Sequence, residues 1–379
     1  MTLPAINGTA SLSPAQKELK AVTKAFVEHS FLVDAYMKIR QALMLPEGYG
    51  VVLVVGPAGV GKSALASACA AAQAPAPGSS LPPLLLPSPP GSIPIVSVAA
   101  RTGTTFMSRW KALLLDILKV TNQPLTEAAD GSKSSAPVVA GRGYETFSIP
   151  RLESAAIASL RYRGTVAVIV DEGQDLAPFD SKLDSIQMAK SLKHLGSATG
   201  TVLVVFGSYA LLNFLDLSAQ LSRRCSVVHF PRYDVAKPAD RSNFQRVFSN
   251  FCSAAPTMLP YQQLSPAFPL LYTASGGGTG NLRLWLVRAI GTATAAGAPC
   301  VTTAHLHAER LTDQTIQQMF EAAHSGEERF AKLYSTLDAT IASIFSGVPF
   351  PTSTVPTLSG QRRQPGKRNP HRDLIAAAA

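Results

Sequence analysis

Apolar positions in the middle of the chain form short unbroken runs that alternate with stretches of helical periodicity. Unbroken apolar runs are typical of strands buried on both faces of a parallel sheet. They predict strands at residues 50–55, 95–98, 166–170, 201–206 and 226–230. The stretches between them repeat apolar residues every three or four positions and predict helices at 63–70, 106–120, 154–162, 181–195 and 209–215. This alternation predicts an α/β core of three layers, with a parallel sheet between helices.

The two ends of the chain lack strand patterns. Helical spacing from residue 13 to 43 predicts one or two helices before the first strand. Beyond Pro231 the strand pattern stops, and helices are predicted at 239–251, 282–296, 304–321 and 325–344. We therefore expect four parts. They are an N-terminal helical segment at 1–45, the α/β core at 46–235, a small α-helical domain at 236–345 and a basic, disordered tail at 346–379.

Composition adds two interruptions to the core. Residues 74–94 contain eight prolines, and residues 122–144 are rich in Ala, Gly and Ser. Proline continues neither a helix nor a sheet ladder, so both stretches are expected to be flexible insertions.

Charge and cysteine usage limit the class of protein. A net charge of +10 points to an acidic partner such as nucleic acid, although part of the excess lies in residues 361–372. That basic run is either a solvated extension or a specific contact. The four cysteines are far apart, which suits a reducing cytoplasm and argues against disulfides and zinc. No signal peptide and no apolar run of 18 residues is visible, so no membrane segment is expected.

A glycine-rich motif joins the first predicted strand to the next helix. It fills every fixed position of the pattern G-x-x-x-x-G-K-[ST] and, with the residue after it, comprises Gly56, Pro57, Ala58, Gly59, Val60, Gly61, Lys62, Ser63 and Ala64. Glycines let the backbone wrap around phosphates, and a helix N-terminus directs N–H groups at them. Lys62 is then expected to reach the β- and γ-phosphates, and Ser63 to bind Mg²⁺. The alternative, a plain glycine-rich turn, does not explain the lysine and serine.

Two carboxylates follow the strand predicted at 166–170. Asp171 is placed to hold Mg²⁺ through its water shell, and Glu172 to act as the general base on the attacking water. The alternative is an exposed acidic turn. Ligands gather at the carboxyl ends of parallel strands, which favours the catalytic interpretation downstream of a phosphate loop.

Three further positions fit the same chemistry. Ser208 follows the strand at 201–206, where its hydroxyl either senses the γ-phosphate or caps the next helix. Arg223 and Arg224 precede the last strand, and an arginine from a neighbouring subunit stabilises phosphoryl charge.

Together these residues resemble the AAA+ ATPases. In that family Gly56 to Ser63 corresponds to Walker A, residues 166–172 to Walker B, Ser208 to sensor 1, and Arg223 or Arg224 to the arginine finger. Arg283, in Gly278-Thr279-Gly280-Asn281-Leu282-Arg283, corresponds to sensor 2, which contacts the nucleotide from the lid. The resemblance implies a P-loop NTPase core with a parallel sheet, a small α-helical lid, and hydrolysis of ATP with Mg²⁺.

Within that superfamily the chain resembles the TnsC/TniB group of transposition regulators. The resemblance rests on softer motifs, Asp171 to Leu176, Val205 to Ser208, Gln220 to Tyr233 and Gly276 to Leu282, and spans roughly residues 20 to 300. It implies an oligomer, a ring or filament, that forms with ATP on double-stranded DNA and links a target-selector protein to a transposase. Hydrolysis then drives disassembly. It also implies a bacterial, cytoplasmic, nucleoid-associated protein.

Candidate DNA contacts cluster after the second strand, although an ordinary polar helix start explains them equally well. They are Arg101, Thr102, Thr104, Thr105, Arg109 and Lys111. Lys and Arg there would neutralise phosphates without reading bases. Three alternatives to transposition stay open: a superfamily 1 helicase, a replication-type loader, and a non-catalytic scaffold. The helicase motif Gly-Asp-x-x-Gln is absent, because Gly207-Ser208-Tyr209-Ala210 stands in its place.

Overall fold

A computed structural model describes residues 13–45, 50–71, 79–85, 87–121, 147–176, 182–217, 225–335 and 341. The chain divides into two compact units, residues 1–331 and 332–379, and the elements below lie in the first, apart from the last residue of the final helix. Among the described residues, no helix combines the length and the apolar character needed to span a membrane.

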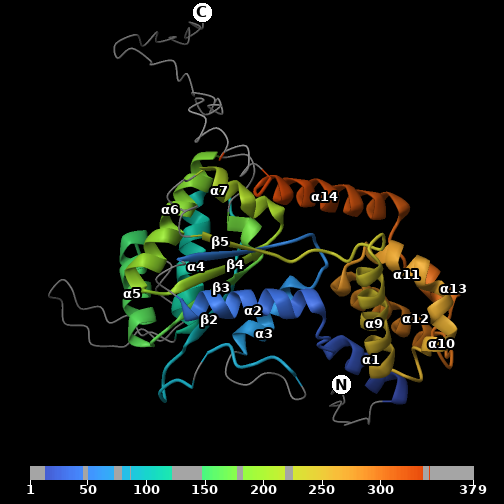
Figure 1. Cartoon of the computed structure of the whole chain (residues 1–379). Helices are drawn as coiled ribbons and strands as arrows, with labels where there is room; N and C mark the ends of the chain where they lie inside the picture. Colours follow the sequence, from blue (N-terminus) through green and yellow to red (C-terminus); the bar gives the residue numbers. More distant parts are fainter. Residues whose placement is uncertain are drawn as a thin grey trace, which may run out of the picture. The chain divides into compact units, whose positions relative to one another are not determined.

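A five-stranded parallel sheet forms the centre of the core (Figure 1). The strands are β1 (Val51–Val55), β2 (Ile95–Ala99), β3 (Ala167–Asp171), β4 (Val202–Gly207) and β5 (Cys225–His229). Their order is β2-β3-β4-β1-β5, with Val51 paired to both Leu203 and Cys225. Every residue of β1 and β4 is buried, as the unbroken apolar runs predict. The predicted parallel sheet is confirmed.

Helices cover both faces of this sheet. On one face, α2 (Ser30–Met44) and α3 (Lys62–Ala70) pack on alternate strand residues such as Val52, Val54 and Phe206. The other helices of the core are α4 (Phe106–Val120), α5 (Ile149–Tyr162), α6 (Lys182–Thr199) and α7 (Asn213–Leu217). Of these, α4 packs on β2, and α6 packs on β1 and β4. Helix α5 packs on α4 and α6. Two short 3₁₀ helices, η2 (Gly173–Leu176) and η3 (Tyr209–Leu212), follow β3 and β4 at the carboxyl edge of the sheet.

A helical domain with its own core follows β5. It contains α9 (Pro238–Ala254), α10 (Tyr261–Leu264), η4 (Ser265–Ala267), α11 (Phe268–Ser275), α12 (Thr279–Ala295), α13 (Thr303–Ala308) and α14 (Asp313–Lys332). Phe244, Phe248 and Trp285 are buried in this core. Val22 of α1 (Pro14–Lys24) is buried with them, so the N-terminal helical segment is shared between the two cores.

Several predicted boundaries differ from the structure. The helices expected at 304–321 and 325–344 are instead α13 and a continuous α14, which begins after Thr312 because that side chain accepts from the Thr315 N–H at 3.2 Å. The helices α10 and α11 were not predicted. The proline-rich stretch is partly packed down, because Leu81 and Leu84 are buried and Tyr36 donates to the Pro82 carbonyl at 2.8 Å. Residues 122–144 and the tail at 346–379 lie outside the described residues.

Candidate nucleotide site

The glycine-rich motif forms a tight loop between β1 and α3. Gly59 and Gly61 adopt φ values of 77° and 104°, which disfavour any residue with a Cβ atom. A Cβ atom at Gly56 would lie 2.0 Å from the carbonyl oxygen of Phe230, the residue after β5, so this position also requires a glycine. The loop therefore keeps its backbone N–H groups close to the N-terminus of α3, as an anion cradle requires.

Lys62 lies at the first position of α3 and points into this loop. Its Nζ atom donates to the carbonyl oxygens of Gly56 at 3.0 Å and Pro57 at 2.7 Å. Burial lowers the pKa of Lys62 to about 8, although Glu172 and Asp171 act in the opposite direction. A half-buried ammonium group held mainly by neutral carbonyls fits an anionic ligand, because a phosphate would compensate its desolvation.

The predicted carboxylates lie at the carboxyl end of β3, facing the loop. Glu172 has a φ of 53°, and no other described non-glycine residue has a positive φ. Its N–H donates to Asp171 Oδ1 at 2.9 Å. A strained backbone at such a position is characteristic of functional sites. Both carboxylates influence Lys62, so the structure brings the two halves of the predicted site together.

Ser208 lies between β4 and η3, at the N-cap of η3. Its hydroxyl accepts from the Ala210 N–H at 3.3 Å, which is the capping role that was one of its two predicted roles. Ser208 also lines a cavity together with Lys62 and Glu172, so the sensing role stays a prediction. Gln174 of η2, which sequence reasoning missed, accepts from the Ser208 N–H at 3.1 Å and donates to Glu172 Oε2.

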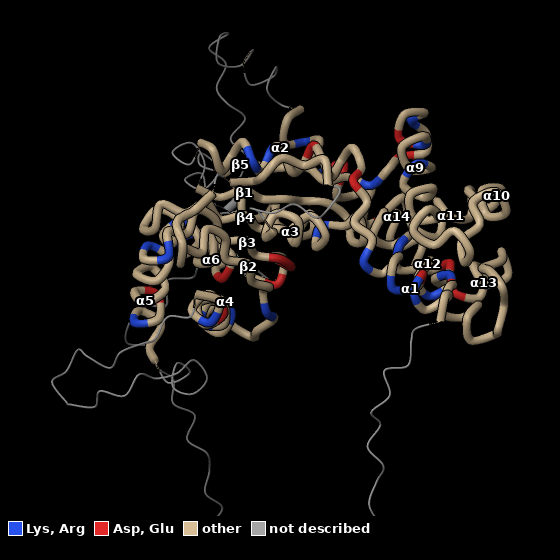
Figure 2. Tube along the Cα trace, turned by 90° about the horizontal axis from the view of Figure 1, so that it is seen from below, with Lys and Arg blue, Asp and Glu red and all other residues tan. Residues whose placement is uncertain are grey.

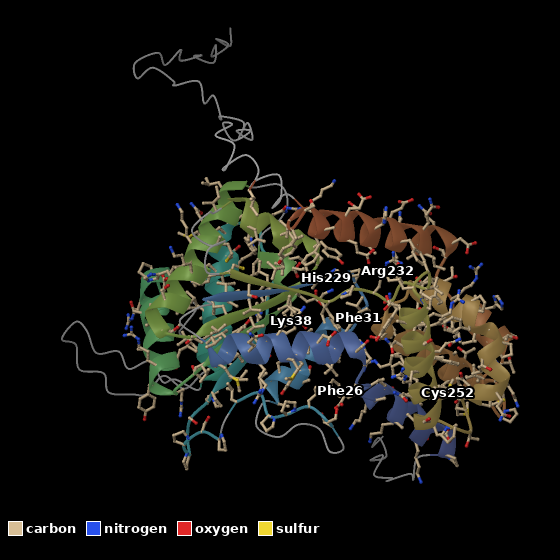
Figure 3. All side chains as sticks on the ribbon, viewed as in Figure 1. Phe26, Phe31, Lys38, His229, Arg232 and Cys252 are labelled. Atoms are coloured by element: carbon tan, nitrogen blue, oxygen red, sulfur yellow. The ribbon has the colours of Figure 1, made fainter. Side chains whose placement is uncertain are left out.

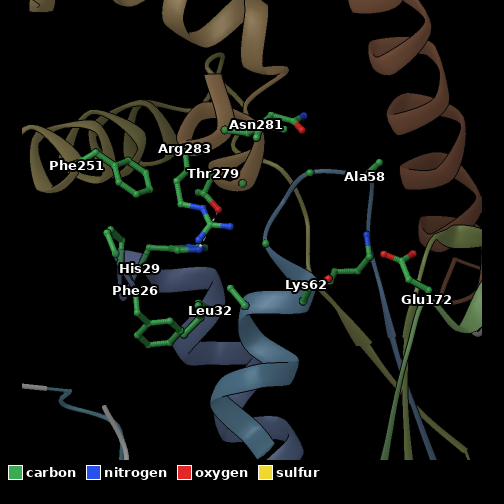
Figure 4. A pocket seen from close by; sticks show the side chains of 18 of the residues that line it. Phe26, His29, Leu32, Ala58, Lys62, Glu172, Phe251, Thr279, Asn281 and Arg283 are labelled. Carbon is green, nitrogen blue, oxygen red and sulfur yellow. Dashed lines mark hydrogen bonds between the residues drawn. The ribbon is translucent and has the colours of Figure 1, made fainter. Parts of the chain in front are cut away.

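A cavity of about 340 Å³ extends from the loop toward the lid (Figure 4). Figure 4 shows Lys62 and Glu172 on one side of the loop, and Phe26, His29 and Arg283 on the other. The second side is mostly apolar apart from His29 and Arg283, and it comes from the segment between α1 and α2, from α2, from α9 and from α12. Its apolar lining residues are Phe26, Val27, Leu32, Phe251 and Leu284. Ligand pockets of this kind are mostly apolar with a few placed polar groups.

The first turn of α12 lies directly on the glycine-rich loop. The Asn281 N–H donates to the Gly59 carbonyl at 2.9 Å, and the Thr279 hydroxyl donates to the Val60 carbonyl at 2.7 Å. A Cβ atom at either Gly278 or Gly280 would lie 2.8 Å from the Gly59 carbonyl oxygen. Glycine is therefore needed at both positions of the Gly-Thr-Gly-Asn sequence, because a side chain there would keep the lid away from the loop.

Arg283 lines the cavity but lies on the side of α1. Its Nη1 atom donates to the Thr23 carbonyl at 3.0 Å. Beside it, His29 hydrogen-bonds through Nδ1 to the Tyr233 hydroxyl at 2.9 Å and stacks on Phe230. Burial lowers the pKa of His29 to about 4, so this side of the cavity holds a neutral imidazole at neutral pH. The predicted nucleotide contact of Arg283 stays a proposal.

A second cavity of about 490 Å³ lies between the loop and α14. The Arg232 guanidinium forms two hydrogen bonds with Glu327 of α14, at 3.0 and 3.2 Å, and Phe330 stacks on His229 at a centroid distance of 4.1 Å. Figure 3 shows His229 and Arg232 beside this helix. A Cβ atom at Gly326 would collide with the Tyr209 ring, so α14 packs closely on η3.

The remaining candidate residues are placed as follows. Arg223 and Arg224 lie outside the described residues. Arg101 and Thr105 are exposed, but Arg101 pairs with Asp116 at 2.6 Å and Thr105 caps α4. Thr102 and Thr104 are exposed and Lys111 is half-buried.

Arg109 is buried and therefore unavailable to a phosphate backbone. Its side chain is 2% exposed, pairs with Asp184 at 2.8 Å and donates to the Gly103 carbonyl at 2.6 Å. It holds the 101–105 loop from inside, and we remove it from the candidate DNA contacts. Figure 2 shows basic and acidic residues mixed along α4 and α5 rather than one continuous basic face.

The residues at the carboxyl edge fit a magnesium ion that is held partly by the protein and partly by the phosphates of a nucleotide. Mg²⁺ commonly uses one or two carboxylates, substrate phosphates and several waters. Ser63 lies in the first turn of α3, after the loop that follows β1. Asp171 is the last residue of β3, at the same carboxyl edge of the sheet. Within the described ranges no cluster of three or more His, Cys, Asp or Glu is placed to hold a metal by itself.

Comparisons with known proteins agree with this architecture. Residues 45–215 match the family model described as AAA domain. The ADP form of the Aeropyrum pernix ORC2 protein matches with a TM-score of 0.51 and 14% identity, over 76% of this chain and 71% of that chain. The ADPNP-ADP complexes of the same protein match with a TM-score of 0.46 and 15% identity, over 79% of this chain and 68% of that chain. The structure of Drosophila ORC bound to DNA matches with a TM-score of 0.44 and 16% identity, over 92% of this chain and 83% of that chain. No curated protein sequence matches the chain.

The sheet, the glycine-rich loop and the helical lid therefore define a P-loop AAA+ fold. At these identities the structural likeness concerns the fold, and the match to the ADP form carries it. The fold implies nucleotide binding.

Proposed function

We propose that this chain is an ATP-hydrolysing regulator of DNA transposition that assembles on duplex DNA with ATP and dissociates after hydrolysis. The observation that carries the ATPase part is the convergence of Lys62, Asp171 and Glu172 at one edge of the sheet, beside a lid bonded to the loop. Transposition is the finer part of the proposal and rests on the sequence motifs.

Each residue of the site has a distinct part in hydrolysis. Lys62 and the N–H groups of the loop bind the β- and γ-phosphates, and Ser63 and Asp171 would hold Mg²⁺, which supplies charge neutralisation on the phosphates. Glu172 accepts a proton from the attacking water as that water adds to the γ-phosphorus atom. The bond to the bridging oxygen breaks, and ADP and inorganic phosphate leave.

Assembly is proposed because, among the described residues that line the cavity, no cationic side chain other than Lys62 lies on the phosphate side. Lys62 and Arg283 are the charged bases of that cavity, and Arg283 bonds to α1. Arg223 or Arg224 of a second copy would complete the site. Hydrolysis would then be coupled to the presence of a neighbour.

DNA binding is proposed for the surface after β2. Arg101 is 59% exposed there, next to Thr102 and Thr104. Contacts of this kind go to phosphates, so binding is expected to tolerate any sequence and to fall steeply with salt. The basic tail after residue 347 is proposed to recruit a transposase or a target selector. Truncation there should abolish transposition while DNA-stimulated ATPase activity is retained.

Substitution Glu172→Gln tests the proposal. It should lower the rate of ATP hydrolysis by about 10³-fold, since a general base contributes about 10²–10⁴, while ATP-dependent assembly on DNA persists. Glu321→Gln on the exposed face of α14 is the matched control and should behave as wild type. Sedimentation and phosphate release measure the two properties. A Glu172→Gln protein that binds ATP yet neither assembles nor binds DNA would refute the regulator.

A replication-type ATPase is the second candidate, because the fold matches the ADP form of an ORC2 protein. The two candidates differ in what the tail recruits. Transposition that depends on the tail supports the first, and ATP-dependent loading of a helicase supports the second. A chain without measurable turnover would instead be a nucleotide-dependent scaffold.

A further inference from the structure

Gln174 lies at the carboxyl edge of the sheet, between the segment that follows β3 and the segment that follows β4. Its side chain is half-buried in η2, directly after β3. The amide oxygen accepts from the Ser208 N–H at 3.1 Å, and the amide nitrogen donates to Glu172 Oε2. One side chain thus connects the proposed base on β3 to the segment that follows β4.

The orientation of this amide is determined by its partners. A backbone N–H only donates, and an ionised carboxylate only accepts. The oxygen must therefore face Ser208 and the nitrogen must face Glu172, since the flipped amide would lose both bonds. Glutamine suits this position because it offers a donor and an acceptor on one short planar group.

Two glycines pack tightly around this connection. A Cβ atom at Gly207 would lie 2.7 Å from the Gln174 amide oxygen and 3.1 Å from its backbone nitrogen. A Cβ atom at Gly173 would lie 2.3 Å from a Val205 methyl group. The absence of side chains at both positions allows η2 to sit against β4, so the amide has little freedom to move away from Ser208.

We propose that Gln174 is a positioning residue that fixes the Glu172 carboxylate relative to the Ser208 segment. The inference rests on the proposed ATPase function and adds a connection to it. Any displacement of Ser208 by a γ-phosphate moves the N–H that holds the Gln174 oxygen. The Gln174 nitrogen then moves with it, and the Glu172 carboxylate is re-aimed toward the attacking water.

Gln174→Glu separates the two bonds. The new carboxylate can still accept from the Ser208 N–H, but it faces Glu172 with a like charge and without a donor. Asp175 already adds a neighbouring negative charge. Gln174→Ala removes both bonds. Because Gln174→Ala adds no charge to the cavity and leaves the glycine-rich loop intact, its nucleotide affinity should stay within about twofold of wild type. The kcat of each variant should fall by about 10- to 100-fold, because misplaced catalytic groups cost about this much.

Gly207→Ala tests the same connection from the opposite strand. Its methyl group should push the Gln174 amide aside and lower kcat without changing KM. Gln187→Glu, at an exposed position of α6, is the matched control for the added charge. In a Glu172→Gln background, Gln174→Glu should lower the residual rate by less than twofold, because residues that act through one another are not additive.

The outcomes separate this inference from the proposed function. A wild-type protein that does not hydrolyse ATP refutes the proposed function. Active wild type with a Gln174→Glu variant of unchanged kcat refutes the positioning role alone. Loss of affinity together with a lowered Tm in both Gln174 variants and in Gly207→Ala would also refute it, because it would show a purely structural role. Lowered kcat with unchanged KM and Tm supports it.

Discussion

The two sides of the cavity are built in different ways. The phosphate side consists of backbone N–H groups, Lys62 and two carboxylates, all supplied by the ends of buried strands. The opposite side consists of apolar side chains, a neutral His29 and the Arg283 guanidinium, supplied by segments far apart in the chain. The phosphate side is therefore formed by the sheet and the start of α3, with the first turn of α12 bonded to its loop, whereas the opposite side also needs the segment before α2, α2 and α9. We infer that phosphate binding and base binding depend on different parts of the chain.

Lys62→Met should have the largest effect on nucleotide affinity. It removes the cation of the phosphate side, and a hydrogen bond to a charged group contributes about 1.5–3 kcal/mol. Dissociation constants for ATP should rise by about 100-fold, which is about 2.7 kcal/mol. Titration with a fluorescent ATP analogue measures this, with Lys190→Met on the exposed side of α6 as control. An unchanged affinity would mean that the phosphates bind elsewhere.

Phe26→Ala should weaken binding on the opposite side by about tenfold, since stacking of a base on an aromatic ring contributes about 1–3 kcal/mol. The loss should be equal for ATP and ADP, because Phe26 lies away from Lys62 (Figure 4). Tyr162→Ala, where the ring is 79% exposed, is the aromatic control. A loss confined to ATP would contradict the assignment of the two sides.

His29 should make the opposite side sensitive to acid. Its pKa is lowered from 6.5 to about 4 in the folded protein. Above about pH 6.5 the group is neutral in both states, and between about 6.5 and 4 only the unfolded chain takes up the proton. The free energy of unfolding therefore falls as the pH falls through this window, by about 1.4 kcal/mol for this group at about pH 5.5.

Denaturant titrations across this pH range measure the slope. His29→Gln should make the slope shallower but leave the part due to His229, whose pKa burial also lowers to about 4. An equal slope in His29→Gln and wild type would show that His29 carries no such linkage.

Gly280→Ala should have the smallest effect and should act on both sides together. Its methyl group would lie 2.8 Å from the Gly59 carbonyl, so the lid must shift away from the loop. We expect affinity for ATP and ADP to fall by about threefold, about 0.6 kcal/mol. Gly291→Ala on the same helix meets no atom within 4 Å and is the control. An equal loss in the control would mean that the close approach of Gly280 to the loop is not responsible, since alanine is the better helix former at both positions.

The phosphate side was predictable from the sequence and the opposite side was not. Strand runs and a local motif define Lys62 and Glu172, because strand ends of a parallel sheet must meet at one edge. Phe26 and His29 lie in a segment without a motif, and they reach the cavity only through packing of α1 on the lid. Periodicity also missed the role of Arg109, since a polar helix start looks the same whether its arginine faces solvent or Asp184.

A structure determined with a non-hydrolysable ATP analogue and Mg²⁺ tests the central claim most directly. The account predicts phosphates on the loop from Gly56 to Ser63 and a base between Phe26 and Leu284, in the cavity of about 340 Å³. A base bound instead in the cavity of about 490 Å³ beneath α14, with no contact to residues 25–29, would contradict it.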